Sequence, residues 1–367
     1  MHEFIPDNPY ILLTPGPLST SKGVRAALLR DWCTWDADYN EDIVQNIRRR
    51  LVSLATGDTE NYTTVLMQGS GSFAVEACLG SALPADGKLL ILTNGRYGDR
   101  MVDMAKVLDI NYMKMEFDEV TAPTAAELEH LLKLNPSFTH VAFVHNETTT
   151  GLLNPLEELS SVVKRFGKVL IVDAMSSFGG MPFDVSELGI DFLVSSSNKC
   201  IQGVPGFGFV IAKRSSLENC KGNARSLCLD LFGQWDEMEK KTGKWRYTSP
   251  THVVRAFYQA LDELEEEGGV QARFARYSEN HRLLVDGMRS LGFETLLPDD
   301  IQAPIITSFL YPNESFNFKS FYDAVKSKGF VLYPGKISKA DTFRIGNIGE
   351  VYPDDIRRLI EVIAAIG

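Results

Sequence analysis

The sequence predicts an α/β fold in which a mainly parallel, seven-stranded sheet forms a large domain, with a smaller α+β domain at the C-terminus. Between residues 62 and 213, short apolar runs alternate with stretches of helical periodicity, a pattern typical of crossover connections between parallel strands. The length of 367 residues exceeds what one small core organises, so two domains are expected. After residue 293, strand-like runs and two helical patterns predict a separate unit.

The first 21 residues are predicted to form an arm that lies against the rest of the protein. Residues 15–17 read Pro-Gly-Pro, a rigid turn that neither a helix nor a central strand can continue. Three hydroxyl residues follow this turn, and they can either cap the next helix or line a polar pocket. Helices are then expected over residues 22–30 and 41–55, the second because its apolar residues recur at the helical period.

The large domain is expected over residues 22–255 and contains the alternating segment. Ligands of parallel sheets bind beyond the carboxyl ends of the strands, so the residues that follow each strand are the candidates for chemistry. The predicted strands span 62–67, 88–93, 111–117, 140–145, 168–173, 191–196 and 207–212, and the predicted helices 72–82, 96–108, 124–134 and 155–166.

The small domain is expected over residues 256–367. Residues 251–292 have the pattern of two long helices that break at a pair of glycines after a run of glutamates. The remaining elements are predicted strands at 293–297, 305–311, 331–333 and 342–345, a helix at 316–328 and a closing helix from 353.

The composition argues against several classes of protein. A net charge of −11 argues against a nucleic-acid partner, because phosphate binding needs clustered lysine and arginine. The five cysteines form no C-x-x-C motif, so neither a disulfide framework nor a metal site is predicted. The N-terminus has no pattern of a secretory signal, and no apolar run approaches the length of a membrane span, so a cytoplasmic protein is expected.

A lysine after the sixth predicted strand is the main candidate for a catalytic group. The apolar run that starts at Asp191 closes in three serines, and Asn198 and Lys199 precede a glycine-rich turn. Most lysines at strand ends point into water. A lysine fixed at a buried strand end is instead partly desolvated, which lowers the pKa of its amine and makes it a nucleophile for carbonyl carbons, as a Schiff-base lysine requires.

Other strand ends supply the remaining groups that pyridoxal 5′-phosphate needs. Residues 69–72 read Gly-Ser-Gly-Ser and open a helix, where backbone N–H groups and the helix dipole attract a phosphate. Tyr97 offers an aromatic face for the ring, and Asp173 offers a carboxylate for the pyridine nitrogen. Each residue alone is more often structural, but together with Lys199 as general acid and base they predict this cofactor.

A dinucleotide-binding module without catalytic activity is an alternative. The G-x-G-x-x-A pattern at 69–74 matches the dinucleotide fingerprint, which requires an acidic residue at the end of the next strand. That strand ends in Thr93-Asn94 instead, which counts against a nucleotide.

The ordered set of motifs resembles the class V, fold type I pyridoxal-phosphate aminotransferases, a group that includes alanine–glyoxylate and serine–pyruvate aminotransferases. The resemblance covers nearly the whole chain. Cysteine desulfurases share this fold, but their chemistry needs a mobile cysteine loop, and no cysteine follows Cys228. The motifs are Leu-Thr-Pro-Gly-Pro at 13–17, Gly-Ser-Gly-Ser at 69–72, Asn-Gly-Arg-Tyr-Gly at 94–98, His-Asn-Glu-Thr-Thr-Thr-Gly at 145–151, Val-Asp-Ala-Met-Ser-Ser at 172–177, Ser-Asn-Lys at 197–199, Arg-Tyr-Thr-Ser-Pro at 246–250 and Phe-Arg-Ile-Gly at 343–346.

The resemblance implies roles for individual residues around the cofactor. Tyr97 would stack on the ring, where close relatives carry a tryptophan, and Thr149 would approach the ring hydroxyl. Thr248 would reach the phosphate held by a neighbouring subunit, which implies a homodimer with shared active sites. The residues implied to bind the cofactor are Ser70, Gly71, Ser72, Tyr97, Thr149, Asp173, Asn198, Lys199 and Thr248, with Asp173 and Lys199 as the catalytic pair.

The resemblance also implies the substrates. Residues 12–20 and 30–36 are most similar to the branch that uses 2-aminoethylphosphonate as amino donor and pyruvate as acceptor, with alanine–glyoxylate or serine–pyruvate transamination as the alternative. Arg344 would bind the acidic end of the substrate, and its planar fork suits carboxylate and phosphonate alike. The residues expected to add hydrogen bonds to the phosphonate are Gly16, Ser19 and Thr20.

Overall fold

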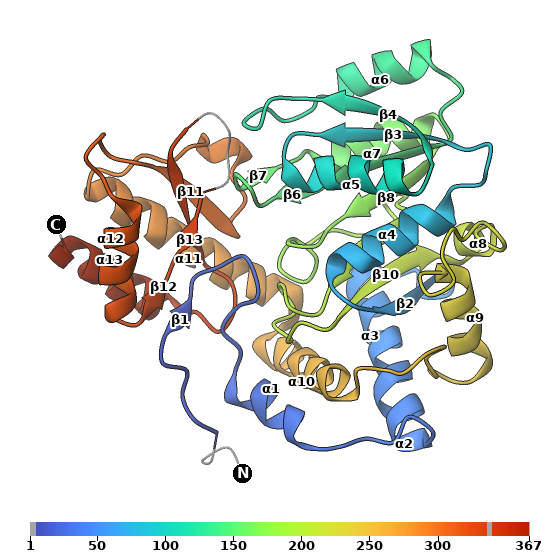
Figure 1. Cartoon of the computed structure of the whole chain (residues 1–367), viewed down its shortest axis with the longest axis horizontal. Coiled ribbons are helices and arrows are strands. Elements are labelled where there is room, and N and C mark those ends of the chain that lie inside the picture. Colours follow the sequence, from blue (N-terminus) through green and yellow to red (C-terminus); the bar gives the residue numbers. More distant parts are fainter. Residues whose placement is uncertain (1–4, 336–339, 367) are drawn as a thin grey trace.

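A seven-stranded sheet lies at the centre of the computed structural model, which describes residues 5–335 and 340–366 (Figure 1). Its strand order is β2-β10-β9-β8-β5-β3-β4, and β10 alone runs antiparallel to its neighbours. The predicted fold class is confirmed, and each of the seven strands predicted for this sheet is present to within one residue at either end. The strands are β2 (Tyr62–Gln68), β3 (Lys88–Thr93), β4 (Asn111–Glu116), β5 (His140–Val144), β8 (Val169–Asp173), β9 (Phe192–Ser196) and β10 (Phe207–Lys213).

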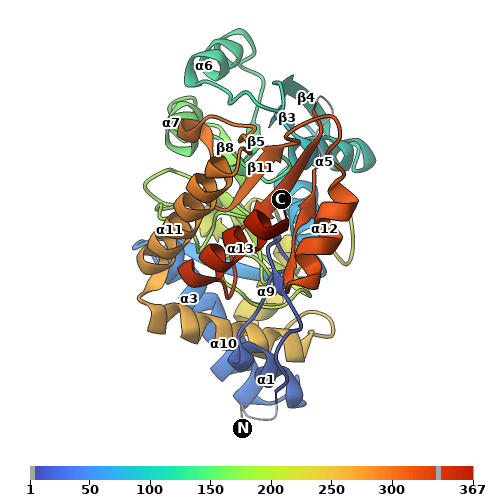
Figure 2. The same ribbon diagram turned by 90° about the vertical axis from the view of Figure 1, so that its left-hand side faces the viewer.

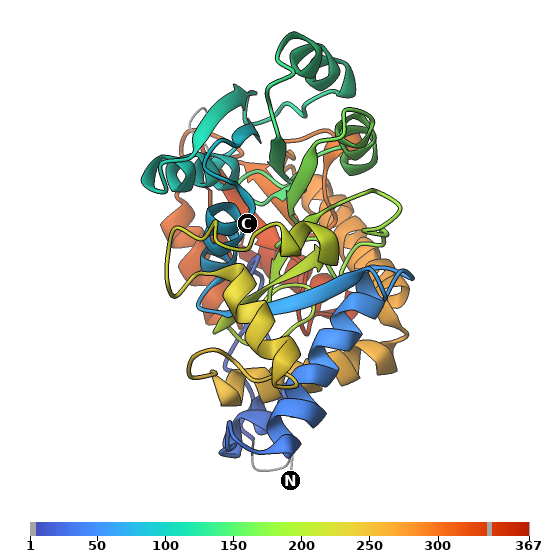
Figure 3. The same ribbon diagram turned by 90° about the vertical axis from the view of Figure 1, so that its right-hand side faces the viewer.

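Helices cover both faces of this sheet, because alternate strand residues point to opposite sides. Leu89 and Ile91 pack with α4 and α5 on one face, whereas Leu90 and Leu92 belong to the core under α3, α6, α7 and α10 on the other. In Figure 3, α3 (blue) and α9 (yellow) both pack against the edge strand β2. The covering helices are α3 (Asn46–Ala55), α4 (Gly71–Ala82), α5 (Arg96–Val107), α6 (Ala125–Leu134), α7 (Leu156–Arg165), α9 (Leu231–Lys240) and α10 (Thr251–Glu267).

The C-terminal part has its own core around a three-stranded antiparallel sheet of order β11-β14-β13. Its helices face the viewer in Figure 2. The prediction of a strand at 293–297 was wrong, because only Thr295 forms a bridge, to Phe309 of β11. The elements are α11 (Gly269–Ser290), β11 (Ile306–Leu310), α12 (Phe318–Ser327), β13 (Tyr333–Pro334), β14 (Thr342–Gly346) and α13 (Pro353–Ile366).

The N-terminal segment joins the two parts. Its strand β1 (Ile11–Leu12) pairs with β12 (Phe330–Val331) of the C-terminal part, and the N–H of Gly346 donates to Leu13 O at 3.0 Å. The chain then crosses to α1 (Lys22–Ala26), which Ser21 caps by accepting a bond from Val24 N at 3.0 Å. Helix α1 and the 3-10 turn η2 (Ala27–Leu29) pack on α10, so the predicted helix at 22–30 is part α and part 3-10.

Several short elements had no clear signal in the sequence. The first third of the helix predicted at 41–55 is a π-helix, η3 (Asn40–Gln45). None of the described helices has the length and apolar character needed to cross a membrane. The division into an arm at 1–21 and domains at 22–255 and 256–367 stays a prediction. The remaining elements are α2 (Ala37–Tyr39), β6 (Asn146–Glu147), β7 (Leu152–Leu153), α8 (Arg214–Glu218) and η4 (Asp299–Ile301).

Candidate active site

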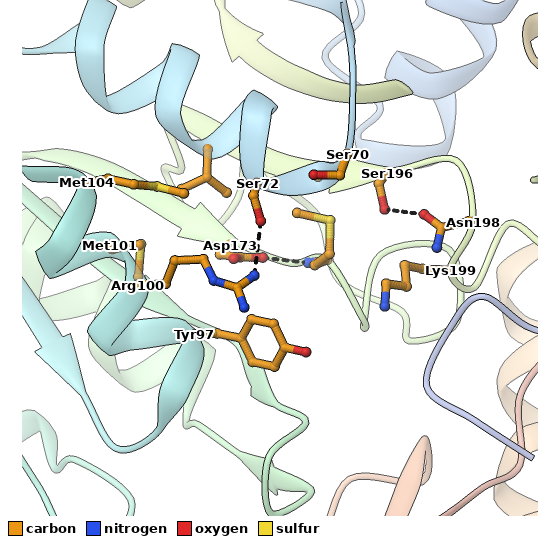
Figure 4. Close-up of a pocket in the computed structure, with 13 residues that line it drawn as sticks. Ser70, Ser72, Tyr97, Arg100, Met101, Met104, Asp173, Ser196, Asn198 and Lys199 are labelled. Atoms are coloured by element: carbon orange, nitrogen blue, oxygen red, sulfur yellow. Dashed lines mark hydrogen bonds between the residues drawn. The ribbon is translucent and has the colours of Figure 1, made fainter. Parts of the chain in front are cut away.

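A pocket of about 230 Å³ lies at the carboxyl edge of the central sheet. The start of α4, the first turns of α5 and the segments that follow β8 and β9 form its walls, and the side chains of Tyr97 and Lys199 point toward the same space (Figure 4). The structure thus brings together seven of the predicted site residues. The lining residues are Ser70, Gly71, Ser72, Val75, Tyr97, Arg100, Met101, Met104, Asp173, Met175, Ser196, Asn198 and Lys199.

Lys199 follows β9, as predicted, and its amine faces the N-terminal turn. Its Nζ donates to Pro15 O at 2.8 Å and to Gly16 O at 3.4 Å. Burial lowers the pKa of Lys199 to about 8, although Asp173 and Cys200 oppose that shift. A larger fraction of this amine than of an ordinary lysine is therefore neutral near physiological pH, as a carbonyl nucleophile requires.

Gly16 brings the backbone of the N-terminal turn against Lys199. Its φ is +108°, and a Cβ at this position would lie 2.7 Å from Asn198 O and 2.8 Å from Lys199 Cδ. Only glycine therefore permits this contact. Gly16 meets Lys199 through its backbone, and its predicted role in binding substrate stays a prediction.

Asp173 ends β8 and is buried on the opposite side of the pocket. Burial raises its pKa to about 6, and the bond that Oδ1 accepts from Met175 N at 2.9 Å opposes this shift. Its backbone is fixed because Asp173 O accepts from His145 N at 2.9 Å. No described cation forms an ion pair with this carboxylate, so a protonated ring nitrogen would be a favourable partner.

The start of α4 is suited to an anion. Ser70 is the N-cap residue but makes no side-chain capping bond, so the first N–H groups of the helix are available to a ligand. A Cβ on Gly71 would lie 2.5 Å from Met175 Cε, which explains a glycine at the beginning of the helix. These features and the buried carboxylate fit a ligand that has a phosphate at one end and a basic ring nitrogen at the other, as pyridoxal 5′-phosphate does.

Arg100 is a pocket residue that sequence reasoning missed. Its Nη1 donates to Ser72 Oγ at 3.0 Å, and its guanidinium carbon lies 4.9 Å from the centre of the Tyr97 ring. It therefore adds a positive charge beside the start of α4. The signal was present in the sequence, because Tyr97, Arg100 and Met104 are spaced to share one face of a helix.

Thr149 lies beside the pocket without lining it. Its hydroxyl donates to Glu147 Oε1 and accepts from Arg96 N at 3.4 Å, which places it at the start of α5 next to Tyr97. The predicted contact with the ring hydroxyl stays a prediction. Glu147, which sequence reasoning also missed, is buried between this threonine and α5.

Arg344 lies in β14, outside the 230 Å³ pocket, and is buried. Its neighbours Phe343 and Ile345 point into the C-terminal core, so Arg344 points away from that core. The guanidinium donates to Pro334 O at 2.8 and 3.0 Å and to Thr148 O at 2.6 Å. Within the described part of the chain no carboxylate pairs with it, and a buried cation without a counter-ion is suited to an anionic substrate.

The structure does not place Ser19, Thr20 or Thr248 in the pocket. Ser19 Oγ accepts from Leu12 N at 2.9 Å, so its hydroxyl already supports the fold of the N-terminal segment. Thr248 is exposed on the loop between α9 and α10. The binding roles expected of these three residues stay predictions.

Known proteins similar to this chain share its fold and much of its sequence. Residues 37–326 match the aminotransferase class-V family. A Bacteroides fragilis 2-aminoethylphosphonate–pyruvate transaminase is 65% identical over 97% of this chain and 98% of its own length. The Syntrophobacter fumaroxidans protein of the same name is 64% identical over 97% and 96%. Among solved structures, ureidoglycine–glyoxylate aminotransferase from Bacillus subtilis aligns with a TM-score of 0.89 over 99% of this chain and 94% of that one, at 20% identity.

Proposed function

The chain belongs to the aminotransferase class V family, and we propose that it is a transaminase that depends on pyridoxal phosphate. It would convert 2-aminoethylphosphonate and pyruvate to phosphonoacetaldehyde and L-alanine, in phosphonate degradation. The observation that carries the substrate assignment is full-length identity above 60% to relatives named for this reaction. The geometry of the pocket supplies the groups that such a reaction needs.

The pocket residues would hold the cofactor at three points. When bound, the cofactor offers an aldehyde to Lys199 and a ring that withdraws electrons from the reacting carbon of the substrate. The free N–H groups at the start of α4 would bind the phosphate, with Arg100 beside them. Asp173 would keep a proton on the ring nitrogen, and Tyr97 would lie against the ring.

Lys199 would move the proton between the substrate carbon and its acceptor. With a pKa of about 8, its amine can both accept and release a proton near neutral pH. Two of its N–H bonds point at the carbonyl oxygens of Pro15 and Gly16. The lone pair of the neutral amine is then directed away from these oxygens, so the N-terminal turn helps to aim Lys199.

Arg344 would bind the acidic end of both substrates. Three of its five N–H groups are used by Pro334 O and Thr148 O, and two remain for an oxyanion. The same arginine would serve the phosphonate in one half-reaction and the carboxylate of pyruvate in the other. Hydrogen bonds from Gly16, Ser19 or Thr20 would favour the phosphonate.

The active form is proposed to be a homodimer in which Thr248 reaches the phosphate bound by the other subunit. Thr248 and its neighbour Tyr247 are exposed, and Tyr247 donates to Leu227 O at 3.5 Å. Leu227 and Phe73 also expose apolar side chains, at 72% and 51% of their surface. Phe73 lies in the first turn of α4, and exposed apolar side chains of this kind support a contact with another subunit.

A single-turnover spectrum tests the reaction. The purified protein loaded with cofactor is mixed separately with 2-aminoethylphosphonate, L-alanine, taurine and L-serine, and the yellow absorbance of the lysine-bound cofactor is followed. We expect loss of this band with the phosphonate and with alanine but not with taurine or serine. Loss with serine or alanine but not with the phosphonate would instead indicate serine–pyruvate or alanine–glyoxylate transamination. A protein that develops no yellow band would refute the cofactor assignment.

A further inference from the structure

Glu147, in the short strand β6, is fully buried beside the pocket. Its carboxylate is not among the groups proposed above to contact the cofactor or the substrate. Its Oε2 accepts from the backbone N–H groups of Tyr97 and Gly98, at 3.1 and 3.3 Å. Its Oε1 accepts from the N–H of Thr149 at 3.3 Å and from the hydroxyl of the same residue. Four donors on one buried carboxylate make it the centre of a local network.

The network supplies a cap that helix α5 lacks. Gly95 is the N-cap residue and has no side chain with which to bind the first N–H groups. Glu147 binds two of them from 50 residues further along the chain, and its negative charge lies at the positive end of the helix. A Cβ on Gly95 would lie 2.6 Å from Glu147 Cδ and 2.8 Å from Thr149 Oγ1, so the carboxylate packs directly on the turn before α5.

One of the two residues whose N–H groups Glu147 binds faces the pocket. Tyr97 stands in the first turn of α5, and its side chain lines the cofactor pocket. On the other side, Thr148 O accepts a bond of 2.6 Å from Arg344. The segment from Glu147 to Thr149 is therefore bonded to α5 on one side and to the proposed substrate arginine on the other.

We propose that Glu147 is a positioning residue of the active site: its carboxylate caps α5 from outside the helix, fixes the ring of Tyr97 relative to Asp173 and Lys199, and orients the hydroxyl of Thr149. The inference rests on the proposed role of the pocket in binding pyridoxal 5′-phosphate. Burial raises the pKa of Glu147 to about 7 even though the bonds from Thr149, Gly98 and Tyr97 lower it, which shows how closely the carboxylate is enclosed.

The variant Glu147→Gln tests the proposal with the whole protein. Glutamine keeps the size of the side chain, but its NH₂ group faces N–H donors that it cannot bind. Glu127→Gln is the matched control, because Glu127 caps α6 by accepting from Thr124 N at 3.1 Å and does not line the pocket. Two quantities are measured for both variants: hydrogen exchange at the amides of Tyr97 and Gly98 without cofactor, and the dissociation constant and absorbance maximum of bound cofactor.

We expect Glu147→Gln to exchange these two amides at least about tenfold faster, to bind the cofactor about tenfold more weakly and to shift its absorbance maximum. Glu127→Gln should leave all three unchanged. Faster exchange with an unchanged dissociation constant and spectrum would overturn the proposal, because Glu147 would then stabilise the helix only.

If Glu147→Gln does not fold, Gly95→Ala is measured instead, since its methyl group pushes the carboxylate away from α5 and should have the same effects. A wild-type protein that binds no cofactor would refute the proposed function, while the exchange result on the cofactor-free protein would still decide the capping role.

Discussion

Two buried ionisable residues, Asp173 and Lys199, lie where burial disfavours their charged forms. Burial raises the pKa of Asp173 from 3.8 to about 6 and lowers that of Lys199 from 10.5 to about 8. For Asp173, whose pKa is raised, the stabilising contribution is complete below pH 3.8 and is lost as the pH rises through 6. For Lys199, whose pKa is lowered, it is complete above pH 10.5 and is lost as the pH falls through 8. Between pH 6 and 8 both residues therefore destabilise the cofactor-free fold.

Asp173→Asn should therefore stabilise the cofactor-free protein at pH 7 to 8, by on the order of 1–2 kcal/mol, while weakening cofactor binding. The difference from wild type should shrink as the pH falls below 6 and disappear well below pH 3.8, where Asp173 is protonated in both the folded and the unfolded chain. Thermal unfolding across this pH range measures it. Asp184→Asn is the control and should instead destabilise the protein at pH 7 to 8. The bonds that Asp184 accepts from Glu187 N and from the Thr56 hydroxyl outweigh burial and lower its pKa. A cofactor-free Asp173→Asn protein less stable than wild type at pH 8 would contradict the prediction.

Gly16→Ala should impair Lys199 without unfolding the protein. Its methyl group would lie 2.8 Å from Lys199 Cδ, and alanine is also strained at a φ of +108°. We expect slower formation of the yellow lysine-bound cofactor, on the order of tenfold if the displaced amine costs about 1.4 kcal/mol. Stopped-flow absorbance on adding cofactor measures this rate. Gly57→Ala is the control, since a Cβ at Gly57 meets no atom within 4 Å. An unchanged rate in Gly16→Ala would show that the contact does not aim the amine.

At the scale of elements, the site is built where helices begin without their own caps. Helix α4 leaves its first N–H groups to a ligand, and α5 receives a carboxylate from β6. Helix α6, which lies away from the pocket, has a complete capping box from Thr124 and Glu127. Helix α7 also lacks a side-chain cap and does not line the pocket, so α4 and α5 are distinguished by where their uncapped ends lie and not by the missing cap alone.

The break between α10 and α11 is expected to contribute to the stability of the fold and not to the site. Gly268 has a φ of +107°, a left-handed conformation that lets the chain leave one long helix and enter the next. Gly268→Ala should lower the free energy of unfolding by about 1 kcal/mol, with wild-type transamination below the melting temperature. Denaturant unfolding and a steady-state assay measure the two quantities. Gly222→Ala at a second left-handed glycine is the matched variant, with a similar expected cost. A fall in activity of the folded Gly268→Ala protein would link this break to the site.

For the molecule as a whole, the proposed site takes residues from three regions: the N-terminal turn, the central sheet and the C-terminal β14. Lys199 donates a hydrogen bond to Pro15 O in the N-terminal turn, and Arg344 of β14 donates one to Thr148 O, which follows β6. The proposed dimer would add Thr248 from the other subunit. This last contribution can be tested without a structure of the dimer.

Mixing Lys199→Ala and Thr248→Ala subunits should restore activity. If Thr248 serves the site of the other subunit, a mixed dimer has one site with both residues intact, although each parent has none. Unfolding and refolding the two variants together, followed by an assay, should yield roughly a quarter of wild-type activity, since half of randomly formed dimers are mixed and each has one good site. Activity no higher than the sum of the parents would mean that Thr248 does not act across an interface.

Much of this arrangement could be predicted from the sequence because it depends on local patterns. Hydrophobic periodicity located the seven strands of the central sheet and the helices that alternate with them, and the rule that ligands bind at carboxyl ends of strands selected residues 70–72, 97, 173, 198 and 199. The strand predicted at 293–297 failed because a short apolar run has the same composition whether or not it joins a sheet, and here only Thr295 forms a bridge. The role of Glu147 had no local signal, since its partners at Tyr97 and Gly98 lie about 50 residues away.

The sequence by itself determined the order of strands and helices along the chain, the lysine, the aspartate and the glycine-rich helix start, because each follows from the chemistry of neighbouring residues. Only the tertiary structure decided that Pro15 and Gly16 hold the amine of Lys199, that Glu147 caps α5, and that Arg344 lies against Thr148 O. These contacts join residues 50 to 196 positions apart, and packing of separate elements, rather than any periodicity, brings them together.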